Sequence, residues 1–223
     1  MDWAPLFLSL KLATVSMVLA LVCGTGLAVL FSWRRLPGRE LLYTLAIAPM
    51  VLPPTVLGYY VLVVLGRNSV IGKAWEALFG APIVFSFTGA VIAASIGSLP
   101  LVVRAARIGL ESVDPDLKNA ARTLGARPLR VLFTVVLPLA APAIFAGAML
   151  AFARALGDYG LTQMVAGQRV DGVETGAIHV ANAMFSGHEE AARNMSIAMT
   201  VVGFVLLYAA NYVLNRFARH VHV

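Results

Sequence analysis

The sequence predicts an all-α integral membrane protein with about five transmembrane helices in one domain, residues 1–223. Hydrophobic residues make up 60% of the 223 residues and charged residues only 13%, and the mean hydropathy is +0.84, far from the balance of a soluble domain. The apolar blocks are continuous and about 20 residues long, whereas the strands of a membrane β-barrel alternate apolar and polar residues. Because unpaired backbone groups are costly in hydrocarbon, we expect these blocks to be helices.

The five spans are expected at about 12–33, 41–65, 83–103, 131–152 and 196–214. The second span contains Pro49, Pro53 and Pro54, so its middle is not expected to be a continuous helix. In a bilayer such a break persists only beside other helices or a water-filled cavity, which makes 52–59 a candidate lining of a transport pathway. A bend that merely fits the helix bundle is the alternative.

Two spans carry small residues spaced four apart, a pattern that favours close helix packing. The set is Gly89, Ala93 and Gly97 in the third span and Ala143, Gly147 and Ala151 in the fourth. The polar segments between spans are expected to hold short amphipathic or surface helices at about 73–79 and 178–185.

The distribution of charge predicts the orientation in the membrane. On one predicted side lie eleven of the 17 cations but only four of the 11 acids, a net charge of +7, and the other side has a net charge of −1. These eleven cations are Arg34, Arg35, Arg39, Arg104, Arg107, Lys118, Arg122, Arg127, Arg130, Arg216 and Arg219. Lys and Arg concentrate on the cytoplasmic side, so the N-terminus is expected outside and the C-terminus inside. The total charge of +6 therefore does not indicate nucleic-acid binding.

A polar island between the third and fourth spans predicts a short helix with an apolar face. Asp114 is a good N-cap, Pro115 suits the first helical position, and Gly125 can provide a left-handed stop. One face of this helix is expected to carry Leu117, Ala120, Ala121 and Leu124. Such a helix is suited to a groove on another protein. The alternative is a solvated amphipathic connector between two spans.

This island resembles the EAA loop of ABC-importer membrane permeases in residues Ala120, Ala121, Gly125 and Leu137-Pro138. In that family the loop forms a coupling helix that docks into a cytoplasmic ATPase. Asn119 stands where the family pattern has Glu, so a salt bridge from that position is in doubt while docking of the helix is not. The resemblance implies a cytoplasmic coupling loop at 104–130, with the coupling residues Asp114, Leu117, Asn119, Ala120, Ala121, Leu124 and Gly125.

Four further stretches are similar to the molybdate ABC transporter permease family. They are LPPTVLGYY at 52–60, LGR at 65–67, AARTLGA at 120–126 and LAFARALGDYG at 150–160. In motif order and topology the resemblance covers about 8–215, although the family commonly has Gly-Glu-Phe-Gly in place of the Gly-Asp-Tyr-Gly at 157–160. Sulfate and tungstate permeases are close relatives, so these oxyanions are alternatives to molybdate.

The resemblance implies a multi-pass protein of the bacterial inner membrane that pairs with a second copy of itself. It also implies two ABC ATPase subunits and a periplasmic oxyanion-binding protein as partners, besides membrane lipid. The chain contains no GxxxxGK[ST] phosphate loop, so the energy for transport must come from a partner and the chain itself is not expected to be an enzyme. No cofactor is expected.

Candidate pathway residues follow from the strength of binding that a conduit requires. A divalent oxyanion held by paired arginines would not leave, so weak donors such as hydroxyls are expected instead. Pro53, Pro54, Thr55, Ser95 and Ser98 are the candidates. For each hydroxyl the alternative is a hydrogen bond to its own helix.

Charged residues near the predicted outer mouth form a second candidate site. Arg154 and Asp158 are spaced as an i, i+4 pair and would form a gate or a docking contact for the binding protein, with interfacial anchoring as the alternative. His179 and His188 have no partners at metal-ligand spacing, so no metal site is predicted.

Two other classes of protein remain as alternatives to an ABC permease. A secondary transporter would usually show an inverted repeat and an acidic residue near the middle of a span, and neither is evident. A membrane-embedded enzyme would need convergent catalytic side chains at membrane depth, and the spans offer no charged catalytic pair.

Overall fold

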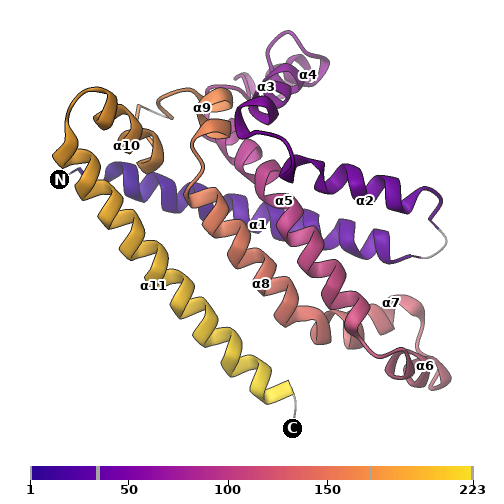
Figure 1. Cartoon of the computed structure of the whole chain (residues 1–223). Helices are drawn as coiled ribbons and strands as arrows, with labels where there is room; N and C mark the ends of the chain where they lie inside the picture. Colours follow the sequence, from indigo (N-terminus) through magenta and orange to yellow (C-terminus); the bar gives the residue numbers. More distant parts are fainter. Residues whose placement is uncertain (1, 34–35, 171, 222–223) are drawn as a thin grey trace.

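The computed structural model describes residues 2–33, 36–170 and 172–221, and within these ranges the chain is helical apart from turns, loops and one isolated bridge between Val170 and Val173. Four long elements dominate: α1 (Ala4–Ser32), α5 (Phe87–Ser112), α8 (Leu137–Leu156) and α11 (Glu189–Val221) (Figure 1). Arg34 and Arg35, predicted as cytoplasmic cations, lie outside the described residues, and so do the side chains of Arg216 and Arg219.

The predicted all-α membrane fold is confirmed. Four helical runs are long and apolar enough to cross a membrane, and a bent helix pair raises the number to five if it is one span. The run Pro128–Leu156 includes α7 (Pro128–Val131), a π-helical turn (Leu132–Val136) and α8. Since Pro138 and Pro142 lack the amide hydrogens that a regular helix uses, a wider turn beside them is expected.

The bent pair is the second predicted span. It consists of α2 (Arg39–Ile47), a single 3₁₀ turn (Ala48–Met50) and α3 (Pro54–Leu65), and the two halves make an angle of 114° at the break. The predicted interruption is therefore confirmed. Pro53 is extended at φ −56° and ψ 138°, because the following Pro54 disfavours the helical conformation for the residue before it.

Several other predicted boundaries differ from the structure. α1 already begins at Ala4 and α11 at Glu189, earlier than the predicted starts at about 12 and 196. α5 ends at Ser112, beyond the predicted end at 103, and therefore carries Arg104 and Arg107 on its last turns. Hydropathy marked only the apolar part of this helix, whereas the hydrogen-bonded backbone continues past the first arginines.

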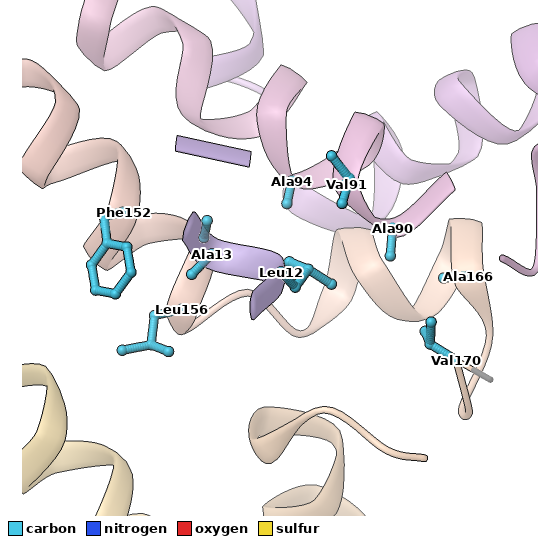
Figure 2. Packing of buried hydrophobic residues seen from close by; sticks show 10 residues of the cluster. Leu12, Ala13, Ala90, Val91, Ala94, Phe152, Leu156, Ala166 and Val170 are labelled. Carbon is cyan, nitrogen blue, oxygen red and sulfur yellow. The ribbon is translucent and has the colours of Figure 1, made fainter. Parts of the chain in front are cut away.

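α5 is the central helix of the bundle and contacts α1, α8 and α9 (Gly160–Ala166). Figure 2 shows one part of the core, in which side chains of these four elements and of Val170 meet. The residues are Leu12 and Ala13 of α1, Ala90, Val91 and Ala94 of α5, Phe152, Ala155 and Leu156 of α8, and Ala166 of α9. Because the residues of α5 in this cluster are small, α1, α8 and α9 can all pack closely against it.

The small-residue face predicted for the fourth span packs against α5. Ala151 is fully buried, and a Cβ atom built on Gly147 would lie 2.7 Å from Cβ of Ala105 and 3.2 Å from Cα of Val102. The face predicted for the third span points elsewhere, because Ala93 joins the core between α3 and α9 and Gly97 faces Leu161. Each helix therefore uses its small residues against a different partner.

The short helices gather at the two ends of the bundle (Figure 1). At the end where the chain begins, α10 (Gly176–Phe185) is tied to α1 by a hydrogen bond of 2.8 Å from the Gly176 amide to the Ser9 hydroxyl oxygen. The helix α4 (Val70–Phe79) follows α3. At the opposite end lie α6 (Pro115–Thr123) and α7, near the end of α1. Short helices 70–79 and 176–185 match the two that were predicted, with earlier starts.

Replacing Gly147 by valine is expected to lower the stability of the bundle. The added side chain would meet the backbone of α5 at Val102, which has no flexible end to move aside, so we expect a loss of about 1–3 kcal/mol in the free energy of unfolding. Thermal unfolding of the purified protein in detergent measures this change.

Gly26→Val is the matched control, because Gly26 lies in α1 with no other atom within 4 Å of an added Cβ. Equal melting temperatures for the two variants would contradict close packing at Gly147.

Candidate functional site

The helix α6 is sharply defined at both ends. Oδ1 of Asp114 accepts a hydrogen bond of 2.8 Å from the Asp116 amide, and Pro115 occupies the first helical position. At the other end Gly125 has φ +83°, the Gly125 amide donates to the Arg122 carbonyl, and the Ala126 amide donates to the Ala121 carbonyl. These two bonds form a Schellman motif, which fixes where the helix stops.

One face of α6 carries exposed apolar side chains. Leu117 is 50% exposed and Leu124 is 89% exposed, although both are leucines that proteins usually bury. Ala120 and Asn119 are also exposed, whereas Ala121 is half-buried and packs against the cluster of Leu110 and Val113. Three residues of the predicted apolar face, Leu117, Ala120 and Leu124, are therefore exposed, whereas Ala121 is the point where the helix rests on the bundle.

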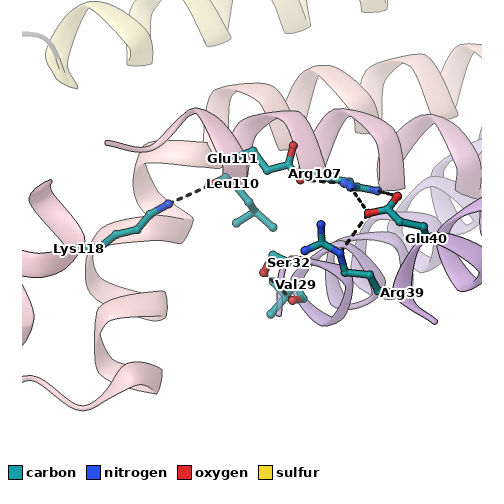
Figure 3. A network of polar contacts seen from close by, with 8 residues as sticks. All are labelled: Val29, Ser32, Arg39, Glu40, Arg107, Leu110, Glu111 and Lys118. Atoms are coloured by element: carbon teal, nitrogen blue, oxygen red, sulfur yellow. Dashed lines mark hydrogen bonds and ion pairs between the residues drawn. The ribbon is translucent and has the colours of Figure 1, made fainter. Parts of the chain in front are cut away.

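A lysine attaches α6 to the end of α5. Nζ of Lys118 donates a hydrogen bond of 3.3 Å to the Leu110 carbonyl oxygen (Figure 3). Leu110 lies in the last turn of α5, where carbonyl groups have no partner within the helix. The lysine supplies that partner, so the position of α6 is coupled to the end of α5.

A network of charged side chains connects the end of α5 with α2 (Figure 3). The Arg107 guanidinium donates to Oε1 of Glu111 at 2.9 Å and to both carboxylate oxygens of Glu40, at 3.1 and 3.5 Å. Nε of Arg39 lies 3.1 Å from the same Glu40 carboxylate. The guanidinium carbon of Arg107 also lies 4.1 Å from the ring centre of Tyr43. Arg107 thus joins α5 to α2.

At the other end of the bundle, two motifs that lie more than 100 residues apart in the sequence meet. A Cβ atom built on Gly160 would lie 3.4 Å from Cβ of Pro54 and 3.5 Å from Cγ2 of Thr55. Glycine therefore allows the turn at 157–160 to approach the break between α2 and α3. One turn further along α3, an added Cβ on Gly58 would lie 2.8 Å from Cβ of Met164, so α3 packs tightly along α9.

The turn at 157–160 is held by a buried carboxylate. Asp158 is only 5% exposed, and its Oδ1 pairs with Nη1 of Arg154 at 2.9 Å. Its Oδ2 accepts from the amide of Thr162 at 2.8 Å and from the hydroxyl at 2.7 Å. The predicted i, i+4 pair is confirmed, and it also positions the first turn of α9.

Comparison with known proteins assigns the family. The model of the family described as "Binding-protein-dependent transport system inner membrane component" matches residues 16–222 of the chain. This protein belongs to that family. It is therefore a multi-pass permease of the inner membrane, a transport subunit and not an enzyme.

Two curated relatives and one solved structure illustrate the likeness. The molybdenum transport system permease protein ModB of Escherichia coli (strain K12) is 46% identical to the permease over 161 residues, 72% of this chain and 70% of ModB. The sulfate transport system permease protein CysT of Escherichia coli (strain K12) is 30% identical over 215 residues, 95% of this chain and 77% of CysT. A chain of the inward-facing MetNI methionine ABC transporter has a TM-score of 0.74 at 16% identity, covering 97% of this chain and 99% of that chain, which is a likeness of fold.

The three hydroxyls that were predicted to line the pathway differ in their exposure. Thr55 is exposed beside the exposed Pro53 and Pro54. Ser95 and Ser98 are buried instead, and their hydroxyls donate at 2.6 and 2.7 Å to the carbonyls of Val91 and Ala94 in their own helix. Their hydrogens are therefore used inside the subunit, and Ser95 also lies 3.3 Å from the Ser16 carbonyl in α1.

The contact between Arg107 and Glu40 was not predicted from the sequence. The i, i+4 spacing of Arg107 and Glu111 was a local signal for half of the network. Glu40 lies 67 residues before Arg107, and no spacing rule connects positions that far apart. The juxtaposition of Gly160 with Thr55 was missed for the same reason.

Replacing Asp158 by alanine is expected to destabilise the permease. The substitution removes the partner of Arg154 and leaves the buried Thr162 amide without its acceptor, so the free energy of unfolding should fall by about 2 kcal/mol. Thermal or denaturant unfolding in detergent checks this. Glu190→Ala is the control, because that carboxylate is 82% exposed and 3.9 Å from Arg193. Equal stability of both variants would show that the Asp158 contacts contribute nothing.

Proposed function

We propose that this protein forms the membrane pathway of an ATP-driven oxyanion importer, with molybdate as the transported anion. Two copies of the chain would enclose the pathway, each as one permease domain of residues 1–223. ABC ATPase subunits would bind on the cytoplasmic side, and a periplasmic oxyanion-binding protein would deliver the anion on the other. The observation that carries the proposal is the capped helix α6 with its exposed Leu117 and Leu124.

The role of α6 as a coupling helix is supported by its shape and exposure. Leucines that are 50% and 89% exposed on a short, well-capped helix are costly in water, and burial in a groove of a partner would recover that cost. The cap at Asp114, the stop at Gly125 and the exposed Asn119 and Ala120 complete the surface offered to the ATPase. Ala121, held in the bundle, would transmit the force.

The break between α2 and α3 is our candidate for the pathway. Pro53, Pro54 and Thr55 are exposed on the single subunit, which leaves them available to the space between two copies. Thr55 offers a hydroxyl, a weak donor that lets an anion leave again. Ser95 would act only indirectly, by bonding α5 to the Ser16 carbonyl of α1, and the hydroxyl of Ser98 bonds within α5 itself.

The orientation follows from the charges. The end of the bundle with α6 and α7 carries the positive excess of the sequence, so we place it in the cytoplasm. The ion pair of Arg154 with Asp158 then lies toward the outer side, and its guanidinium, 36% exposed, remains available to the binding protein or to an arriving anion.

Molybdate is proposed over sulfate because the likeness to a molybdenum permease is stronger, 46% against 30% identity. Tungstate has the same shape and charge as molybdate and remains an alternative substrate.

Uptake of labelled molybdate tests the assignment. The permease is expressed with an ABC ATPase and an oxyanion-binding protein from the same organism, in a bacterial strain that lacks its own molybdate permease. We expect ATP-dependent uptake that excess tungstate inhibits and excess sulfate does not. Sulfate uptake without molybdate uptake would move the protein to the sulfate class, and uptake driven by an ion gradient without nucleotide would refute an ABC importer.

Leu117→Glu and Leu124→Glu are expected to uncouple transport from ATP hydrolysis. Both side chains are exposed, so a charge there should leave the subunit folded, but it would have to be buried in an apolar groove when the ATPase binds. We expect transport to fall by about tenfold or more, equivalent to at least ~1.4 kcal/mol of lost docking energy. Vesicle uptake and ATPase rates measure both effects.

Leu78→Glu is the matched control. Leu78 is 79% exposed on the amphipathic helix α4 at the opposite end of the bundle, so the same substitution there should leave coupling unchanged. If the α6 variants couple transport to ATP hydrolysis as well as the wild type, α6 is not the coupling helix. The same conclusion follows if Leu78→Glu loses as much coupling as they do.

A further inference from the structure

We propose that Arg107 is a positioning residue that makes α2 move together with the coupling helix α6. The inference rests on the proposed function, since it assigns a route by which motion at the ATPase reaches the break at Pro53. Arg107 itself lies outside the coupling helix and outside the candidate pathway.

The first step links α6 to α5. Lys118 donates to the Leu110 carbonyl, and Ala121 packs in the same cluster as Leu110 and Val113. Both contacts act on the last turn of α5. A displacement of α6 therefore pulls or pushes this turn, and the hydrogen-bonded helix passes the movement to Arg107, three residues earlier.

The second step links α5 to α2 through a single side chain. The Arg107 guanidinium is only 16% exposed, it makes two hydrogen bonds to the Glu40 carboxylate, and it stacks on the ring of Tyr43. Glu40 and Tyr43 are both on α2 and lie one turn apart. The planar guanidinium therefore holds α2 at two successive points, a geometry that a lysine ammonium would not reproduce.

In the third step α2 follows α5, because the other contacts that hold α2 are weak. None of its residues is buried, so apolar packing contributes little to its position. Tyr43 makes an edge-to-face contact with Phe31 of α1, with ring centres 6.0 Å apart, and this same tyrosine is already held by Arg107. The guanidinium is thus a large part of what makes α2 follow α5.

The fourth step carries the movement to the break. α2 continues through Ala48–Met50 into the bend of 114°, and α3 after the bend is packed along α9 by Gly58 and Gly160. One half of the pair is held by α9, and the other half is held to α5 by Arg107 and by contacts of the Ala48–Met50 turn. Movement of α5 relative to α9 would therefore change the angle at the break, where the exposed Val51 and Thr55 lie.

The test measures movement of the break without relying on transport of any particular anion. Val51→Cys, combined with Cys23→Ser, places a single thiol at a position that is 85% exposed in the break. In the complex with its ATPase, reactivity of this thiol toward a maleimide is compared with and without a non-hydrolysable ATP analogue. We expect the nucleotide to change the labelling rate severalfold in the parent.

Glu40→Gln is the decisive variant because its side chain is 62% exposed, so folding should be preserved. We expect it to reduce the nucleotide effect on labelling by about threefold to fivefold, as for the loss of one partly exposed charge pair. Arg107→Gln should do the same, and the double variant should add little more, since both changes remove one contact. Arg107→Lys should be intermediate.

Glu111→Gln is the matched control. It removes another exposed carboxylate from the same guanidinium, but Glu111 belongs to α5 itself and makes no link to α2. The inference would be overturned if the nucleotide did not change labelling in the parent, or if its effect survived in Glu40→Gln. It would also be overturned if the effect were lost equally in Glu111→Gln. If the labelling pattern is as expected while molybdate uptake is absent, the link stands and only the anion assignment fails.

Discussion

Close packing of α5 against α1 and α8 is the constraint on which the rest of the structure depends. In a bilayer the hydrophobic effect does not draw helices together, so contact between their backbones and small side chains must do so. An added Cβ would lie 2.9 Å from Val102 at Gly24, 2.8 Å from Ala143 at Gly109 and 2.7 Å from Ala105 at Gly147. With α5 fixed along its length, its two ends hold the contacts to α6 and to α9 in defined places.

The interrupted helix is supported on one side by close packing of a neighbouring turn. Pro49, Pro53 and Pro54 cannot donate backbone hydrogen bonds, and such a break would be costly if it faced lipid. The turn at Gly160 lies directly against Pro54 and Thr55, and Asp158 anchors that turn through Arg154 and Thr162. The break is therefore supported from one side by a rigid polar turn, while its other side is exposed.

The charged side chains of the permease are placed in a way that suits the proposed transport of an anion. Arginine is paired at both ends of the bundle, with Glu40 and Glu111 near α6 and with Asp158 near α9. The exposed break lies beside the turn that contains Asp158, and it carries Thr55 and no charged side chain from residue 48 to residue 65. A divalent anion at the break would thus meet a weak donor rather than an unpaired positive charge, which favours release over retention.

The sequence by itself determined the features that depend on neighbours along the chain. Helical spans follow from apolar blocks, the limits of α6 from Asp114 and Gly125, the break from Pro53 and Pro54, and the pair of Arg154 and Asp158 from a spacing of four. Each depends on residues that are near one another in the sequence and that control the local backbone conformation.

Only the tertiary structure decided which distant residues meet. It placed Gly160 against Thr55, brought the hydroxyl of Ser95 to the Ser16 carbonyl of α1, and brought Arg107 to Glu40. These outcomes depend on how whole helices pack, and packing is set by the shapes of several faces together. A periodic pattern shows that a face is small or apolar, but the helix that covers it is chosen by the fold as a whole.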